Sequence, residues 1–388
     1  MPKPAFREIH TRTRFQGLRS TLVVIDPLAR IFMIELAKFG GEIDARRCAY
    51  NARDRMKRAV IAGLLVLIAV SVAGVVFIEI RQGQGNREAA AFLAEFAVDP
   101  VEGLGSTRTL RILPLIDFHT SDPGLRTEVG VSYLIETDDR RILFDVGQNT
   151  DSESPSPLER NMKALGIDLA SVDTVFISHN HFDHVGGMQW QRLRTFSLGT
   201  EQMPFPNPRA RAIVPTRMTY PGLKPERAAG PKRLGEGIAT TGAIPRQLVI
   251  GWIEEQSLVV NVDGLGAVLI VGCGHQPVPN LVERYEAAFG EPLYGIVGGL
   301  HFPLPKGRIP VGPINGQLRF ASGESMLHPM TMADIRAHLD LLKSRDLGLI
   351  AVGGHDSSDE VIEMVRTDFG DAHRYVRVGE EIVISASR

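Results

Sequence analysis

Residues 179–184 read His-Asn-His-Phe-Asp-His (HNHFDH), so three imidazoles and one carboxylate fall within six positions. The apolar run Val172–Ser178 stands directly before them and predicts a buried strand, and Gly186 and Gly187 allow a tight turn after them. Imidazole and carboxylate are ligands that zinc prefers and that iron and manganese also accept. We therefore interpret residues 179–184 as a metal-binding loop. The alternative is a chance cluster of solvated histidines.

The order of the ligand-type residues favours two ions. In extended backbone His179 and His181 project to the same side and can share one ion. Asp183 and His184 lie further along the chain and can reach a second ion. We expect two divalent cations, most simply zinc, with iron or manganese as alternatives.

The H-x-H-x-D-H spacing after a strand resembles the signature of the metallo-β-lactamase superfamily. That resemblance implies an α+β fold, a four-layer αββα sandwich carrying one or two metal ions. Residues 143–147 (LFDVG) resemble the family's LFDTG strand end. Residues 241–246 (TGAIPR), 272–275 (GCGH) and 298–301 (GGLH) resemble a narrower branch that contains the dihydropterin ribofuranosyl-aminobenzene phosphate synthase-like proteins. The matches span residues 108–386.

Three later histidines, His275, His301 and His355, each follow an apolar strand across glycines, which let the backbone approach an ion closely. The rim of a sandwich would bring such strand ends together, so we expect these histidines near the metal-binding loop. The resemblance implies that one ion is bound by His179, His181 and His275, and the other by Asp183, His184 and His355.

Three further residues are expected at or beside the site. Cys273 stands where the superfamily usually has a bridging aspartate, so it is a thiolate ligand, a non-ligand or a buried inert cysteine. His301 is either a ligand or a catalytic group that donates a proton or stabilises an oxyanion. Asp145 resembles a family aspartate that orients the metal loop without binding metal.

Two segments depart from the branch pattern. Residues 128–132 (EVGVS) resemble the branch's EHGLS, with valine in place of histidine. Residues 354–357 (GHDS) stand where the branch has His-Cys-Thr-Gly, so the histidine is kept and its neighbours differ. We therefore expect a substrate different from that of the pterin relatives.

Periodicity predicts interleaved strands and helices in residues 108–388. Strands are expected at 110–116, 131–136, 141–145, 267–271, 294–297, 347–352 and 381–385. Helices are expected at 157–165, 278–289, 332–345 and 358–369. Ser156-Pro157 resembles an N-cap followed by proline at the first helical position, and no dinucleotide-binding βαβ motif is evident.

Composition excludes few classes of protein. The 388 residues are 44% hydrophobic and 23% charged, which suits a chain with a large core. The formal net charge of −2 gives no field that would favour nucleic acid, so we expect a small-molecule substrate. Cys48 and Cys273 are the only cysteines, so a disulfide framework is not expected.

The run Ala59–Ile80 contains one charged residue, Glu79, and its 22 residues are enough to cross a hydrocarbon layer of roughly 30 Å as a helix. Six cations precede the run: Arg46, Arg47, Arg53, Arg55, Lys57 and Arg58. Only Arg81 and Arg87 lie between the run and Pro100. This bias predicts a single-pass anchor with the catalytic domain on the extracytoplasmic side. The alternative is a buried core helix.

We therefore expect a cytoplasmic segment at 1–58, a transmembrane signal-anchor helix at 59–80, a juxtamembrane linker at 81–107 and a catalytic domain at 108–388. A short helix is expected within the linker at 87–98. Met56-Lys57-Arg58 before the apolar run also resembles the start of a secretory signal, with Ser71-Val72-Ala73 as a cleavage pattern. Translation from Met56 is therefore an alternative start, and an uncleaved anchor is the favoured outcome.

Two segments in the catalytic part are rich in proline. Residues 203–237 hold seven prolines and seven Lys or Arg residues, so they are interpreted as a cationic lid that favours anionic substrates, or as a solvated loop. Residues 303–329 are rich in proline and glycine and are expected to close the opposite side.

These features predict a membrane-anchored hydrolase in which two metal ions activate a water against an ester, phosphodiester or lactone. Asp183 is expected to orient that water and His301 to serve the leaving group. The anionic character of the substrate follows from the cationic segment. The alternatives are a pterin-type synthase that uses the same site, and a metal-dependent sensor without turnover.

Overall fold

The computed structural model describes residues 27–95 and 98–386, and the chain divides into two compact units, residues 1–73 and 74–388. Helix α1 (Pro27–Glu95) contains the whole of the predicted span. It begins far before Ala59, and it continues through residues 81–95, where a linker was expected. This stretch is rich in Ala, Glu, Gln and Arg and contains no proline, so extending the existing helix costs little.

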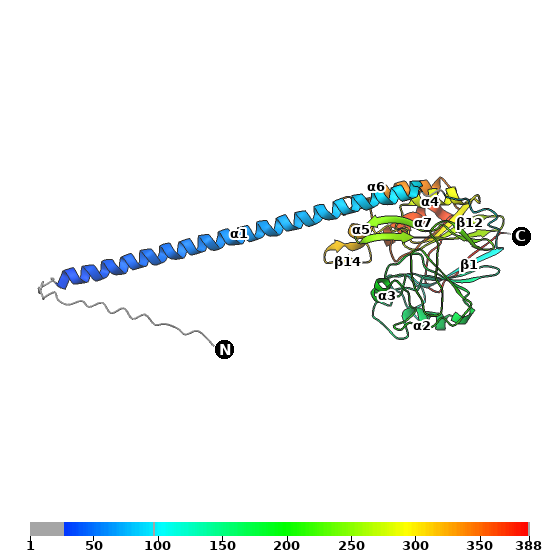
Figure 1. The fold of residues 1–388 in the computed structure, drawn as a ribbon, viewed down its shortest axis with the longest axis horizontal. Helices are drawn as coiled ribbons and strands as arrows, with labels where there is room; N and C mark the ends of the chain where they lie inside the picture. The colour runs from blue at the N-terminus through cyan, green and yellow to red at the C-terminus, as the bar shows by residue number, and fades with distance from the viewer. Residues whose placement is uncertain (1–26, 96–97, 387–388) are drawn as a thin grey trace, which may run out of the picture. The chain divides into compact units, whose positions relative to one another are not determined.

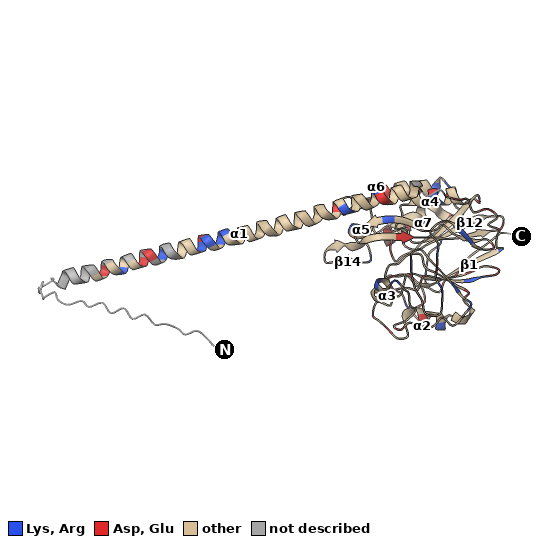
Figure 2. Cartoon of the chain, viewed as in Figure 1, with Lys and Arg blue, Asp and Glu red and all other residues tan. Residues whose placement is uncertain are grey.

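The apolar stretch of α1 does not pack inside the protein. Its side chains are exposed all round, as at Leu67 (65% exposed) and Phe77 (66% exposed), which contradicts the alternative of a buried core helix. Figure 2 shows this stretch free of charged side chains, between a group of Lys and Arg and a short charged segment. Within the described residues α1 is the one helix long and apolar enough to cross a membrane.

Two sheets form the framework of residues 108–386 (Figure 1). The seven-stranded sheet has the order β17-β1-β2-β3-β4-β5-β6, with β17 Ile382–Ser385, β1 Thr109–Ile116, β2 Ser132–Glu136, β3 Arg141–Phe144, β4 Thr174–Phe176, β5 Arg211–Val214 and β6 Glu226–Arg227. The six-stranded sheet has the order β16-β13-β12-β11-β8-β7, with β16 Leu349–Val352, β13 Leu293–Gly298, β12 Gly266–Val271, β11 Leu258–Val262, β8 Ile238–Thr240 and β7 Lys232–Gly235.

Three hydrophobic clusters show how the layers stack. The first joins the inner faces of the two sheets, with Phe144 and Phe176 from one and Val268 and Ile270 from the other. The second packs the six-stranded sheet against α4 (Val278–Ala288), α6 (Met332–Lys343) and α7 (Asp359–Phe369). The third packs the seven-stranded sheet against α2 (Pro157–Ala164) and α3 (Met188–Leu193). The predicted four-layer αββα sandwich is thereby confirmed.

The strands and helices predicted within residues 108–388 are all present, within a few residues of their predicted ends. The short helix predicted at 87–98 is instead the last part of α1, which is described to Glu95. At α2, Ser156 accepts a hydrogen bond from the Glu159 N–H and the Glu159 carboxylate accepts one from the Ser156 N–H, a complete capping box.

Residues 203–237 are not a single loop, as both interpretations assumed. The segment supplies β5 and β6 to one sheet and β7 to the other, so these parts of it belong to the framework. Several of its cations lie in ion pairs, such as Arg211 and Lys232 with Glu226. Frequent prolines between very short strands concealed the strand pattern.

Smaller elements lie outside the two large sheets. Strands β9 (Ile244–Leu248) and β10 (Gly251–Glu255) form a separate hairpin. Residues 303–329 contain the hairpin β14–β15 (Pro310–Val311 and Ile314–Asn315) and helix α5 (Gly316–Ala321).

Candidate metal centre

The HNHFDH loop begins where β4 ends. It is a tight turn in which the His184 N–H donates to the carbonyl of His181 (3.0 Å) and the Gly187 N–H donates to the carbonyl of Phe182 (2.7 Å). Gly186 and Gly187 have positive φ angles of 90° and 123°, which glycine adopts readily. The turn brings the side chains of residues 179–184 to one edge of the sandwich.

The second half of the site comes from three neighbouring strands. Strands β12, β13 and β16 are parallel neighbours, so their carboxyl ends meet at one edge. Cys273 and His275 follow β12, His301 follows β13 and His355 follows β16. Gly272 allows this edge to approach the HNHFDH loop, because a Cβ there would overlap the Ser178 hydroxyl.

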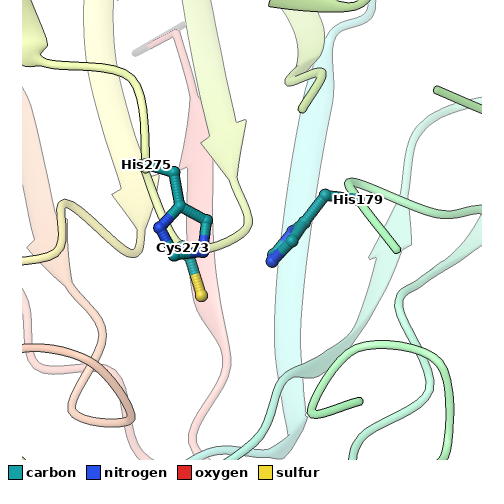
Figure 3. Close-up of side chains that lie close together, drawn as sticks. All are labelled: His179, Cys273 and His275. Atoms are coloured by element: carbon teal, nitrogen blue, oxygen red, sulfur yellow. The ribbon is translucent and has the colours of Figure 1, made fainter. Parts of the chain in front are cut away.

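All the predicted metal-site residues meet in one buried cluster. Four groups of side chains have ligand atoms within 4.8 Å of one another: His179, Cys273 and His275; His184, Cys273 and His355; His179, His181 and Asp183; and Cys273, His301 and Asp356. Figure 3 shows His179 and His275 facing each other with the Cys273 sulfur beside them.

Cys273 joins the two halves of the cluster. Its Sγ lies 3.0 Å from Nε2 of His184 and 3.5 Å from Nε2 of His355, and its side chain is buried. Sγ also belongs to the group formed with His179 and His275. The sulfur atom is therefore within reach of side chains from both halves of the site.

The ionisation and hydrogen bonding of the cluster fit a bound cation. Several buried ligand atoms have no hydrogen-bond partner: Nε2 of His179, Oδ1 of Asp183, and Nδ1 of His275, His301 and His355. Burial and the neighbouring imidazoles lower the pKa of His179 and of His275 well below the usual value, so both rings are neutral and offer a lone pair. Unsatisfied buried nitrogen atoms are costly unless an ion or water binds them. This set of imidazole, thiol and carboxylate fits a divalent ion such as zinc.

Asp145 supports the first half of the cluster, as the resemblance implied. Its carboxylate lies 2.6 Å from Nδ1 of His184 and accepts hydrogen bonds from the Ser178 N–H (2.7 Å) and Oγ–H (2.6 Å). Asp145 adopts a positive φ of 55°, a conformation that costs about 1–3 kcal/mol and recurs at functional sites. The carboxylate thus orients His184 so that Nε2 faces Cys273.

Glu255 supports the second half and was missed from the sequence. Its carboxylate accepts hydrogen bonds from three consecutive N–H groups, those of Cys273 (3.0 Å), Gly274 (2.8 Å) and His275 (2.8 Å). Burial raises the pKa of Glu255 to about 7, although these three donors oppose the rise. No motif marks Glu255, because its role depends on a contact between distant segments.

Two more carboxylates surround His355. Asp117 follows β1 and lies 3.7 Å from Nδ1 of His355, and Asp356 lies 3.6 Å from its Nε2. Burial lowers the pKa of His355, but the two carboxylates outweigh burial and raise it to about 9. Asp117 directly follows a strand, as Asp145 does, and this position could have identified Asp117 as a site residue from the sequence.

His301 lies at the edge of the cluster. The backbone N–H of His301 donates to Asp356 (3.0 Å), and its ring nitrogen Nε2 lies 3.4 Å from the carbonyl of Gln317 in α5. Its φ of 51° is in the left-handed region, as at Asp145. Burial lowers the pKa of His301 to about 3, so the ring is neutral.

Sequence comparison agrees with this arrangement. Residues 125–283 match the family profile described as the metallo-beta-lactamase superfamily. This part of the chain is therefore similar to the metallo-β-lactamase superfamily, in agreement with the predicted superfamily. Members of that superfamily are typically metal-dependent hydrolases that bind divalent metal.

Two proteins of Methanocaldococcus jannaschii are similar to the chain. One is named 7,8-dihydropterin-6-methyl-4-(beta-D-ribofuranosyl)-aminobenzene-5'-phosphate synthase; it is 26% identical over 245 residues, which cover 51% of this chain and 79% of the relative. The other is an uncharacterized protein, 26% identical over 195 residues that cover 44% of this chain and 72% of the relative.

Solved structures of the superfamily are also similar. One is a metal-dependent hydrolase of the beta-lactamase superfamily, with 18% identity, a TM-score of 0.47, and coverage of 71% of this chain and 100% of that chain. Another is a diphosphatase from the PhnP family, with 12% identity, a TM-score of 0.39, and coverage of 70% and 97%.

Proposed function

We propose that the protein is a membrane-anchored hydrolase that uses two divalent metal ions, most simply zinc, on a small anionic ester, phosphodiester or lactone. The observation that carries this proposal is the cluster of imidazoles around Cys273, in which Nε2 of His179 and Nδ1 of His275, His301 and His355 are buried without hydrogen-bond partners. Such a set has no role in packing, because unsatisfied polar atoms destabilise a core.

Each proposed ligand set combines residues from both halves of the cluster. One ion would be held by His179, His181 and His275, since Nδ1 of His181 lies 3.1 Å from Nε2 of His275. The other would be held by Asp183, His184 and His355, since Oδ2 of Asp183 lies 3.7 Å from Nε2 of His184 and both imidazoles approach the Cys273 sulfur. Cys273 would contribute its sulfur between the two sets.

The neighbouring side chains have separate tasks in hydrolysis. Two divalent ions in this cluster would polarise the electrophile and lower the pKa of water. Asp183 orients the attacking water and accepts its proton at Oδ1, which has no other partner. His301 would serve the leaving group as a proton relay: its neutral ring accepts a proton from water at Nδ1, which has no hydrogen-bond partner, and passes that proton to the leaving group. The water oxygen bonds to the electrophile as the bond to the leaving group breaks.

An anionic substrate is supported by Arg246 in β9. Its guanidinium is half-buried and donates to the backbone carbonyls of His275 and Gly323, and no carboxylate among the described residues forms an ion pair with it. Burial lowers the pKa of Arg246 to about 10, so the group stays charged at neutral pH beside the loop of residues 273–275. The cations of residues 203–237 no longer support this preference, because several are held in ion pairs.

Membrane anchoring is supported by the exposed apolar stretch of α1 and by the cations before it. Side chains that are apolar on every face are unfavourable in water, and a bilayer accepts them. The excess of Lys and Arg before residue 59 favours a catalytic domain on the extracytoplasmic side.

The proposal is tested by metal content and turnover of the full chain. The parent protein, a His181→Ala, Asp183→Ala double variant and a matched His328→Ala, Asp139→Ala control would be compared on phosphodiester and lactone reporters. We expect two metal ions per chain and turnover in the parent and control, both reduced in the double variant. Folded parent protein without metal would overturn the proposal, and metal without turnover would favour a sensor.

A pterin-type synthase is the second candidate, supported by the 26% identical relative that carries this name. The same side chains would then position two substrates for bond formation. Location separates the candidates: protease added outside intact cells should digest residues 108–386 of an extracytoplasmic hydrolase. A protected domain that condenses a pterin substrate would favour the synthase.

A further inference from the structure

An exposed apolar face lies on the β9–β10 hairpin and the loop that follows α5. On the inner side of the hairpin, Leu248 and Ile253 pack against Ala321 of α5. On the other side, Ile250 is 56% exposed and Trp252 is 43% exposed. Leu327, in the loop after α5, is 57% exposed. We define Ile250, Trp252 and Leu327 as the apolar face.

The members of the apolar face belong to one connected structure. The Ile250 N–H donates to the carbonyl of Phe320 (3.4 Å), which joins the hairpin tip to α5. Arg246 in the same hairpin donates to the carbonyl of Gly323 in the loop after α5. Figure 1 shows α5 and β14 side by side at this side of the domain.

The carboxyl-terminal part of α1 is bonded to the same structure. Glu79 Oε1 accepts a hydrogen bond from the Leu327 N–H (3.0 Å), and Asn86 Nδ2 donates to the carbonyl of Glu324 (3.0 Å). At Gly85 the helix packs directly against Gln247, so closely that a Cβ on residue 85 would overlap the Gln247 side chain. Gln247 is the cross-strand partner of Trp252 in the hairpin.

These contacts place the apolar face where the membrane span ends. The apolar run of α1 ends at Ile80, so Glu79 stands at the boundary between hydrocarbon and water. Gly85 is five residues beyond Ile80, about 7.5 Å along the helix. The contacts at Glu79 and Gly85 therefore fall within the depth of a lipid headgroup layer, about 5–7.5 Å, where tryptophan is enriched.

We propose that the apolar face inserts into the lipid–water interface beside α1, as a second membrane contact of the domain. This inference rests on the membrane anchoring proposed above. A bilayer is favoured over a protein partner because the face is continuous with the end of the membrane span. Exposed apolar groups at this point would otherwise remain in water.

The contact connects the membrane to the metal centre. Helix α5, which packs under the hairpin, carries Gln317, whose side-chain amide donates to the carbonyl of His355 (3.1 Å). Arg246 links the hairpin to the backbone of His275. The hairpin and α5 therefore contact both the apolar face and the backbone of the metal-centre residues His275 and His355.

The test uses the two tryptophans of the chain in protein reconstituted into vesicles. Phosphatidylcholine–phosphatidylglycerol vesicles with bromine on the shallow acyl carbons quench nearby indole emission. Trp190 is 8% exposed and packs in the core of the opposite sheet, so it serves as an internal reference. We expect brominated vesicles to reduce wild-type emission, and Trp252→Phe to abolish that reduction. In Trp190→Phe, which reports Trp252 alone, emission should fall by about half or more.

Each other outcome is decisive. Protein that floats with the vesicles but shows no bromine-dependent quenching would overturn the apolar-face contact and leave the anchor intact. Trp252 shielded from aqueous acrylamide but not quenched by bromine would assign the face to a protein partner and also overturn it. Protein that does not float with the vesicles would overturn the membrane anchor as well. Metal content and turnover of Trp252→Phe should match the parent, because Trp252 does not contact the metal centre.

Discussion

One half of the metal centre comes from a single loop, residues 179–184, whereas the other half comes from three loops that follow β12, β13 and β16. In the first half, a turn of six residues sets the spacing of the ligand atoms. In the second half, the parallel pairing of the strands sets that spacing, since Val271 pairs with Gly298 and Gly298 with Val352. The first half therefore depends on local geometry and the second on the sheet.

The two halves are also supported differently. Asp145 contacts an imidazole, that of His184, and so orients a ligand directly. Glu255 instead contacts the backbone of residues 273–275 and so shapes the loop that carries the ligands. Disturbing the first support should change metal affinity, whereas disturbing the second should change stability.

The largest effect is expected from His184→Ala compared with His355→Ala. Loss of His184 removes a proposed ligand and leaves buried Asp145 without its imidazole. Turnover should fall more than about 1000-fold, beyond the 10–100-fold loss typical of supporting residues. His355→Ala should cost less, because Asp117 keeps three hydrogen bonds, from Tyr133, Phe118 and Gly354, whereas Asp145 keeps two, both from Ser178. Metal analysis and reporter turnover measure both, and equal losses would contradict the proposed difference.

Substitutions of Cys273 test whether its sulfur binds metal between the two halves of the metal centre. Cys273→Ala should reduce turnover about 100-fold with loss of bound metal. Cys273→Asp supplies a carboxylate at the same place and should retain turnover within about 10-fold of the parent. Cys273→Ala removes the ligand atom and Cys273→Asp replaces it, so the number of metal ions bound by each variant shows whether a ligand is needed at this position. If Cys273→Ala keeps both ions and full turnover, the sulfur has no role in binding.

The two supports are compared by Asp145→Asn and Glu255→Gln. Asp145→Asn should weaken metal affinity about 10–100-fold, because an amide orients His184 less firmly. Glu255→Gln turns an amide N–H toward one of three backbone N–H groups and should cost about 1–3 kcal/mol of unfolding free energy. Metal titration and thermal unfolding separate the effects. The comparison fails if Glu255→Gln changes affinity as much as Asp145→Asn does.

The smallest effect is expected in the core between the sheets. Ile142 in β3 and Ile270 in β12 belong to the same buried cluster, one from each sheet. Ile→Val at either position should lower the unfolding free energy by about 0.5–1.5 kcal/mol. Metal content should not change, since neither residue contacts the site. A larger loss of metal from Ile270→Val would show that the second half is more sensitive to the sheet.

Sequence prediction worked where the information is local. The strand before residue 179, the capped helix at Ser156 and the glycines before His275, His301 and His355 are short patterns, and the structure contains each of them. It failed in residues 203–237, where strands of two to four residues are recognisable only from their partners in the sheets. The helix through residues 81–95 was also underestimated, because a linker was inferred from composition.

The sequence by itself determined the superfamily, the four-layer sandwich and the residues that gather at its edge, because these depend on periodicity and on closely spaced ligand-type residues. Only the tertiary structure decided that Cys273 stands between the two halves, that Glu255 holds the loop of residues 273–275, and that the end of α1 is bonded beside Leu327. Each of these contacts joins residues far apart in the chain. Such contacts depend on how the sheets and helices pack, and the separation of two residues in the sequence does not indicate whether packing brings them together.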